Sequence, residues 1–288
     1  MRPPSILPIG VAALALWAGV AWGANSASQP FSVDRALFAP GSCVLFPPTA
    51  GDTGKTVYLD AGHGGPDPGA IGVTSGGRTI EEATETLAVV QDATVLLRAA
   101  GYQVLDSRTT DSSVVRLRPG DVVDGIFTQP GRHANLVARD LCANLGKADI
   151  LIGVYFNAGA PEDAGSLTLY NDDRPFWRAS AQLAELVQSS ALISLREHGY
   201  DVPDDGVHTD VGYGSLETAA DRAYNHLILL GPPKAGYLTT PSEMPGALIE
   251  PLFITDPAEG SIANGTAGQQ AIARGLVAAV DRYFASAA

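Results

Sequence analysis

Short apolar segments alternate with longer amphipathic ones after residue 55, and this alternation restricts the fold more than any other feature of the chain. The predicted strands lie at residues 56–59, 102–105, 149–154, 165–170, 227–230 and 247–254. The predicted helices lie at residues 81–100, 133–145, 177–198 and 268–285. Strands separated by helices of this length are typical of α/β domains with a parallel sheet. We therefore predict a single α/β domain over residues 55–288, with a twisted, mostly parallel sheet flanked by helices.

The first 54 residues lack this alternation and divide into two parts. Arg2 precedes an apolar run over residues 9–22, and Ala21 and Gly23 are small residues at the −3 and −1 positions of a cleavage site. The run is shorter than the roughly 20 residues that a membrane span needs. We predict a signal peptide over residues 1–23, with an uncleaved anchor as the alternative. Residues 24–54 contain several Pro and Gly breakers and are predicted to form an N-terminal arm or linker.

Charge and the predicted signal peptide restrict the partners and the location. Asp and Glu outnumber Lys and Arg by 31 to 18, which gives a formal net charge of -13. Nucleic acid requires a basic face, so we predict no nucleic-acid partner. Export predicts a secreted, periplasmic or cell-wall location, with no stable membrane insertion after the signal is cleaved.

Cys43 and Cys142 are the only cysteines. In an exported protein they can form one disulfide, which would connect the N-terminal arm to the domain. Two unpaired thiols are the alternative, because bridging depends on a spatial separation that the sequence does not contain.

A histidine surrounded by glycines follows the first predicted strand. Residues 59–70 read LDAGHGGPDPGA, with His63 between two glycines that leave room for a ligand. Tyr155 and Glu250 also lie at or just past predicted strand ends, where sites gather in parallel sheets. The pattern indicates a site at this edge. The alternative for His63 is a tight turn in which its side chain bonds to backbone.

Residues 57–72 resemble the opening motif of zinc-dependent N-acetylmuramoyl-L-alanine amidases, L-D-P-G-H-G-G-x-D-P-G-A-x-G, with Ala61 where proline is usual. The similarity continues through residues 82–111 and 139–149. It ends in residues 244–254, MPGALIEPLFI, which resemble the closing P-A-v-L-v-E-x-g-F motif of the family. Four ordered blocks over about 200 residues imply the phosphorylase/hydrolase-like amidase fold.

The resemblance implies a zinc ion (Zn2+) held by His, Glu and His, with an open position for water. Carried over by position, His63 and Glu82 are the first two ligands, and Glu250 is the catalytic carboxylate. Glu81 competes with Glu82 for the second position. Glu82 is preferred because the count back from Gly101 keeps the helix in register.

The third ligand position carries a tyrosine. The S-I-H-A-N block of the family aligns with residues 153–157, GVYFN, so that Tyr155 stands where histidine is expected. One hypothesis is that Tyr155 ligates the metal as a phenolate. A second is that His208 or His226 substitutes, although both are equally explained as surface or packing histidines. A third is that the site binds metal poorly and the protein is an inactive relative.

The implied reaction is hydrolysis of the amide between N-acetylmuramic acid and L-alanine in peptidoglycan by a metal-activated water. Glu250 would act as the general base, Asn157 would contact the substrate, and a long loop over residues 112–131 would wall the groove. The predicted partner is peptidoglycan, and the chain is expected to act as a monomer. The alternatives are a catalytically impaired protein that binds peptidoglycan or regulates wall remodelling, and a zinc hydrolase acting on another amide.

Overall fold

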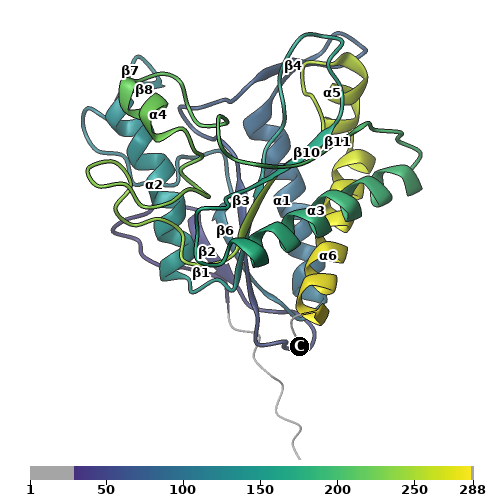
Figure 1. Ribbon diagram of the computed structural model, residues 1–288, viewed down its shortest axis with the longest axis horizontal. Helices are drawn as coiled ribbons and strands as arrows, with labels where there is room; N and C mark the ends of the chain where they lie inside the picture. Colours follow the sequence, from purple (N-terminus) through teal and green to yellow (C-terminus); the bar gives the residue numbers. More distant parts are fainter. Residues whose placement is uncertain (1–28, 287–288) are drawn as a thin grey trace, which may run out of the picture.

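An eight-stranded sheet forms the centre of the molecule (Figure 1). The computed structural model describes residues 29–286, so the predicted signal peptide lies outside the described residues. The strand order across the sheet is β1-β2-β6-β3-β9-β12-β10-β11. The strands are β1 (Phe31–Ser32), β2 (Ser42–Phe46), β3 (Thr56–Ala61), β6 (Gln103–Arg108), β9 (Ile150–Val154), β10 (Ser166–Tyr170), β11 (Asp204–Thr209) and β12 (Gly246–Glu250).

The centre of the sheet is parallel and its flanks are mixed. Strands β6, β3, β9 and β12 run in the same direction, as the alternation of strands and helices predicts. Strand β10 runs antiparallel to β12, and β2 runs antiparallel to β6. The single α/β domain is confirmed, with antiparallel pairs added to a parallel centre.

Helices cover both faces of this sheet (Figure 1). Helices α1 (Glu82–Ala99), α3 (Trp177–Glu197) and α6 (Thr266–Ser286) enclose the larger apolar core on one face, where α5 (Pro257–Ala263) precedes α6. Helix α2 (Gln129–Leu145) covers the other face, with α4 (Ala219–Tyr224) beside it. Strand β3 is buried on both sides because alternate side chains point in opposite directions: Val57 and Leu59 enter the larger core, and Tyr58 enters the smaller one. None of the described helices is long and apolar enough to span a bilayer.

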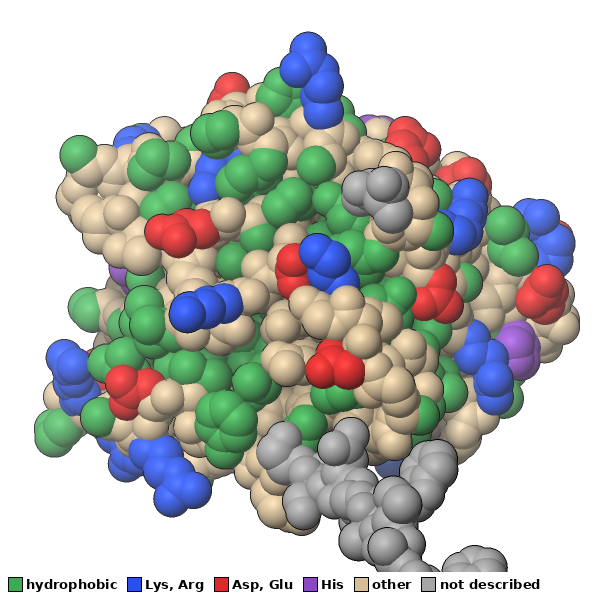
Figure 2. All heavy atoms as spheres, turned by 90° about the horizontal axis from the view of Figure 1, so that it is seen from below, with side chains coloured by type: hydrophobic (Ala, Val, Ile, Leu, Met, Phe, Trp, Pro, Cys, Tyr) green, Lys and Arg blue, Asp and Glu red, His purple; other side chains and the backbone are tan. Residues whose placement is uncertain are grey.

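Two short hairpins lie outside the main sheet. One pairs β4 (Ile71–Val73) with β5 (Thr79–Glu81), directly before α1. The other pairs β7 (Val122–Val123) with β8 (Ile126–Phe127), inside the segment predicted to be a long loop. On the face shown in Figure 2, acidic and basic side chains are interspersed rather than gathered by sign.

The predicted N-terminal arm belongs in part to the sheet, so that prediction was wrong for residues 31–32 and 42–46. Strand β2 pairs antiparallel with β6, with Val44 opposite Asp106, and β1 adds the edge of the sheet. The breakers Pro40, Gly41 and Pro47 flank β2 and do not interrupt it. A five-residue strand between breakers carries too little periodicity to be separated from a linker by sequence.

Two further predictions about strands differ from the structure. Residues 227–230 form a buried turn, in which Gly231 N donates a hydrogen bond to Leu227 O at 2.8 Å. Its apolar side chains, including Leu229 and Leu230, fill the smaller core, and a short apolar run does not distinguish a strand from such a turn. Strand β11 was not predicted because it is a partly exposed edge strand with mainly polar residues.

Cys43 and Cys142 form a disulfide between β2 and α2, with Cα atoms 5.6 Å apart, which confirms the bridged hypothesis. The bond joins residues 99 positions apart, and closing a long loop reduces the entropy of the unfolded chain. We expect the double variant Cys43→Ala and Cys142→Ala to lower the free energy of unfolding by about 2–4 kcal/mol in urea denaturation. Reduced wild-type protein should lose a similar amount. An unchanged denaturation midpoint in the double variant would show that the bridge does not stabilise the fold.

Candidate active site

A cleft of about 530 Å³ lies where the parallel strands end. His63 follows β3, Tyr155 follows β9 and Glu250 ends β12, and all three line the cleft. Glu82, the first residue of α1, lines it as well. The structure therefore brings together the predicted residues at the predicted edge of the sheet.

Two buried arginines hold the loop that carries His63. Arg108 Nη2 donates to Gly62 O and Arg139 Nη2 donates to His63 O, each at 2.7 Å. Both guanidinium groups also bond to Ala61 O, at 3.1 and 2.9 Å. His63 has a φ angle of 60°, in the left-handed region that residues other than glycine seldom adopt. The arginines stabilise this backbone conformation from below the cleft.

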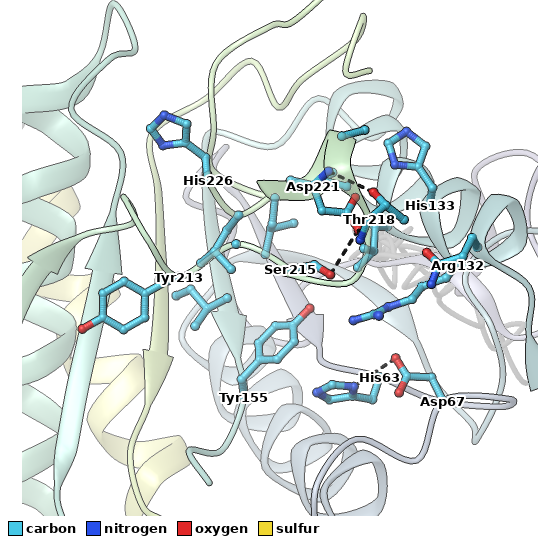
Figure 3. A pocket seen from close by; sticks show the side chains of 18 of the residues that line it. His63, Asp67, Arg132, His133, Tyr155, Tyr213, Ser215, Thr218, Asp221 and His226 are labelled. Carbon is cyan, nitrogen blue, oxygen red and sulfur yellow. Dashed lines mark hydrogen bonds and ion pairs between the residues drawn. The ribbon is translucent and has the colours of Figure 1, made fainter. Parts of the chain in front are cut away.

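The His63 ring lies between two carboxylates. Its Nδ1 atom is 3.0 Å from Asp67 Oδ2, and its Nε2 atom is 3.0 Å from Glu82 Oε1 (Figure 3 shows the pair with Asp67). Burial lowers the pKa of His63, but the nearby charges of Glu82 and Asp67 outweigh it and raise the pKa to about 9. Burial raises the pKa of Asp67, yet its hydrogen bond to His63 and the charge of that ring lower it to about 2.

Backbone donors orient the Glu82 carboxylate toward His63. Phe156 N donates to Glu82 Oε1 and Ala70 N donates to Glu82 Oε2, each at 2.9 Å. A Cβ atom at Gly69 would lie 2.7 Å from Glu82 Oε2, so a glycine is needed for this close approach. The competing residue, Glu81, is exposed in β5. The structure thus places Glu82 beside His63, as the register of the helix predicted.

Glu250 lies at the end of β12 with its carboxyl group largely removed from water. Burial raises the pKa of Glu250, the charge of Glu82 raises it further, and His63 opposes the shift, so that the pKa lies at about 7. A carboxyl group with this pKa can accept and release a proton near neutral pH.

The Tyr155 hydroxyl is bound to the carboxylate of Asp60. Tyr155 Oη donates to Asp60 Oδ2 at 3.0 Å, and Asp60 Oδ1 lies 2.5 Å from Arg139 Nη1. The Tyr155 ring meets the His63 ring edge-on, with centroids 5.3 Å apart. Burial raises the pKa of Tyr155 well above its ordinary value, and the charge of Asp60 raises it further. The Tyr155 hydroxyl is therefore engaged as a donor to Asp60, and this contact does not support the phenolate hypothesis.

The family of the chain follows from a comparison with known proteins. Residues 57–282 match the Amidase_3 family, described as N-acetylmuramoyl-L-alanine amidase. The chain belongs to this amidase family. The matched range covers nearly all of the sheet from β3 onward and includes the cleft residues His63, Glu82, Tyr155 and Glu250.

Relatives and solved structures agree with this placement in the amidase family. The chain is 27% identical over 235 residues to the germination-specific N-acetylmuramoyl-L-alanine amidase of Bacillus subtilis (strain 168), covering 81% of each chain. It is 26% identical over 231 residues to the uncharacterised protein YqiI of the same organism, covering 80% of this chain and 85% of the relative. The structure of the CwlD amidase from Clostridioides difficile in complex with the GerS lipoprotein has the same fold. It matches with a TM-score of 0.60 and 22% identity, over 81% of this chain and 99% of that one.

The donors in the cleft do not fit the three-ligand zinc site that the amidase family implies. His63 Nε2 and Glu82 Oε1 are adjacent, as two ligands of one ion would be. The Tyr155 hydroxyl, however, is already bound to Asp60. Within residues 29–286, no group of three or more His, Cys, Asp and Glu side chains is placed to hold a metal ion. The third position therefore lacks a donor.

Neither of the alternative histidines supplies the third metal ligand. His208 is exposed on β11 outside the cleft, with Nε2 at 2.6 Å from Asp205 O. His226 lines the far end of the cleft, where its Nδ1 atom lies 3.0 Å from Asp210 Oδ1. Asp210 is held at Tyr170, because Asp210 N donates to Tyr170 O. Glu250 pairs with Leu167, three residues before Tyr170 on β10, and three residues of a strand span about 10 Å. The hypothesis of a substituting histidine is therefore not supported.

Asn157, predicted as a substrate contact, does line the cleft of this amidase-family chain, and its Oδ1 accepts from Ala158 N at 2.8 Å.

Several other residues at the cleft had no role assigned from the sequence. Asp67 lies four residues after His63 in the glycine-rich loop, and this spacing could have indicated the contact between them. Asp60 and Arg139 were missed because their pairing joins segments 79 positions apart.

Ala61 shows how the chain accommodates its departure from the opening motif of the amidases. Ala61 N donates to Ser107 Oγ at 3.0 Å, between two buried residues of adjacent strands. Proline has no N–H group and cannot make this bond. Alanine at this position therefore adds a hydrogen bond between β3 and β6, directly before the His63 loop.

Proposed function

We propose that this chain hydrolyses the amide between N-acetylmuramic acid and L-alanine in peptidoglycan. The observation that carries the proposal is the meeting of His63, Glu82 and Glu250 in one cleft of a chain that belongs to an amidase family. These three side chains come from separate segments of the chain. Glu250 has a pKa of about 7 beside His63 and Glu82, and titratable groups with shifted pKa values that gather in one cleft are typical of active sites.

In this proposal Glu250 is the general base. It accepts a proton from the attacking water and delivers it to the departing amine of L-alanine, steps for which a pKa of about 7 is well suited. His63 and Glu82 are the two proposed metal ligands that remain, and Asn157 is the proposed substrate contact. Because the third ligand is missing, we expect weak retention of zinc and slow turnover.

We further propose that the chain acts outside the cytoplasm, in the periplasmic or cell-wall space. Peptidoglycan is located there, and the Cys43–Cys142 disulfide fits an oxidising compartment. The predicted signal peptide is consistent with this location.

A second candidate function is peptidoglycan binding without turnover. The observation that favours it is the Tyr155 hydroxyl, which bonds to Asp60 and leaves two metal ligands where catalytic zinc normally has three. Such a protein would keep the substrate cleft and regulate wall remodelling without cleaving the amide.

The substitution Tyr155→His (Y155H) separates the two candidate functions. An imidazole as the third ligand, beside His63 and Glu82, should raise zinc affinity by about 10- to 100-fold or more, because residues that only orient a ligand already change metal affinity by this much. Isothermal titration with zinc measures the affinity, and stem-peptide release from purified peptidoglycan measures turnover. Release by the wild type supports the amidase, and release only by Y155H supports the binding protein.

Tyr155→Phe is the matched control for that experiment. Since the hydroxyl bonds to Asp60 and does not ligate, its removal should leave zinc affinity within about 2-fold of wild type, far less than the loss of a ligand would cost. A marked drop in zinc affinity for Tyr155→Phe would show that the tyrosine ligates after all.

A further inference from the structure

The cleft has a single arginine and several carboxylates among the described residues that line it. Among the described residues that line it, Arg132 is the only Lys or Arg, whereas carboxylates come from Asp67, Glu82, Asp221 and Glu250. The whole chain carries a formal charge of -13, so an anionic substrate meets mostly repulsion. Figure 3 shows Arg132 extending from its helix into the cavity, on the side where His63 and Asp67 lie.

Arg132 shares a carboxylate with Gln129, three residues earlier on the same side of α2. Gln129 Nε2 donates to Glu217 Oε2 at 2.6 Å, and Arg132 Nη1 forms an ion pair with Glu217 Oε1. Each oxygen of the Glu217 carboxylate thus has its own donor. A guanidinium and an amide placed in this way form a complete binding site for one carboxylate.

Glu217 is an occupant that can be displaced. It lies on the segment between β11 and α4, and the side chains of Arg132 and Glu217 are 33% and 46% exposed. Exposed ion pairs contribute little to stability because water and salt compete with them. A ligand carboxylate that is held elsewhere in the cleft can therefore replace Glu217 at small cost.

We propose that Arg132 and Gln129 bind a carboxylate of the stem peptide, and that Glu217 occupies this site when no substrate is present. The inference rests on the proposed function. It assigns the ligand as the free α-carboxylate of the second stem residue, where that residue is D-glutamate. Two residues span about 7 Å of extended chain from the scissile amide, so this carboxylate stays within the cleft when the amide lies beside Glu250. Arg132 would then select stems with a free carboxylate over amidated ones.

Binding of two matched ligands tests the selectivity. The ligands are N-acetylmuramoyl-L-alanyl-D-glutamate and its D-isoglutamine counterpart, titrated calorimetrically into the Glu250→Gln protein, which blocks turnover. Adding Arg132→Gln to this protein should weaken binding of the glutamate ligand by about 10- to 100-fold, as expected for loss of a charge-assisted hydrogen bond. Binding of the isoglutamine ligand should change by less than about 3-fold, since the amide makes no ion pair.

Glu217→Gln in the same background is the decisive companion, because it removes the internal competitor. It should tighten binding of the glutamate ligand several-fold, the opposite direction to Arg132→Gln. A merely structural ion pair predicts that both variants weaken binding of both ligands, and that result would overturn the proposal. Circular dichroism melting of each variant checks that it is folded.

The same experiment keeps the two proposals apart. If wild-type protein releases no stem peptide but the opposite effects of Arg132→Gln and Glu217→Gln hold, the carboxylate site stands and the amidase activity does not. Equal binding of the two ligands by the parent Glu250→Gln protein would remove the carboxylate site whatever the activity of the wild type.

Discussion

Glu250→Gln is expected to lower the rate of stem-peptide release by about 10²- to 10⁴-fold, the usual contribution of a general acid–base group. Glutamine has nearly the shape of glutamate but neither accepts nor releases a proton at neutral pH. The pKa of Glu250, raised by burial to about 7, is the property that the substitution removes. Binding of peptidoglycan should be retained, because the shape of the cleft is unchanged.

The measurement is the initial rate of release from purified peptidoglycan at saturating substrate, with wall binding followed by co-sedimentation. Glu185→Gln is the matched control, since it makes the same chemical change at an exposed position on α3 outside the cleft, and it should keep the wild-type rate. A Glu250→Gln variant that keeps half of the wild-type rate would exclude Glu250 as the base.

Arg139→Met is expected to lower the free energy of unfolding by about 3–5 kcal/mol, the cost of leaving one partner of a buried ion pair alone. Arg139 and Asp60 are 1% and 0% exposed, so water cannot replace the lost partner. The guanidinium also donates to the carbonyls of Ala61 and His63, which would lose these donors. The same variant should therefore weaken zinc binding through disorder of the His63 loop.

Urea denaturation of a double-mutant cycle measures this energy. Asp60→Leu combined with Arg139→Met should be less destabilised than the sum of the single variants, because the double variant leaves neither charge of the pair buried without its partner. The exposed substitution Arg274→Met is the control and should change the free energy of unfolding by at most about 0.5 kcal/mol. Additive effects of Asp60→Leu and Arg139→Met would show that the two charges are not coupled.

Local patterns predicted the elements that carry their own periodicity. Strands β3, β6, β9, β10 and β12 and helices α1, α2, α3 and α6 lie close to the predicted ranges. The elements that were missed or mistaken are those without such periodicity. They are β2 between its breakers, the exposed edge strand β11, and the buried turn at residues 227–230.

The candidate site also has a part that local sequence features predicted and a part that they did not. The glycines around His63 and the strand ends are local features that predicted a site at this edge of the sheet, and the resemblance to the amidase family named Glu82 and Glu250 as members of it. The direction of each side chain was not predictable, because it depends on partners that arrive from distant segments. The third ligand position had three explanations in the sequence, and the hydrogen bond from Tyr155 to Asp60 on β3 argues against the first, in which Tyr155 ligates the metal.

The sequence by itself therefore determined the α/β class and the edge that carries the cleft, since both follow from periodicity and from short-range chain geometry. The residues that reach the cleft were named by the resemblance of local motifs to the amidase family. Only the tertiary structure decided that Tyr155 bonds to Asp60, that Arg139 neutralises that carboxylate, and that Arg132 holds Glu217 at the rim. Those pairings join residues far apart in the chain, and the energy of a buried or shared charge depends on which groups surround it in space.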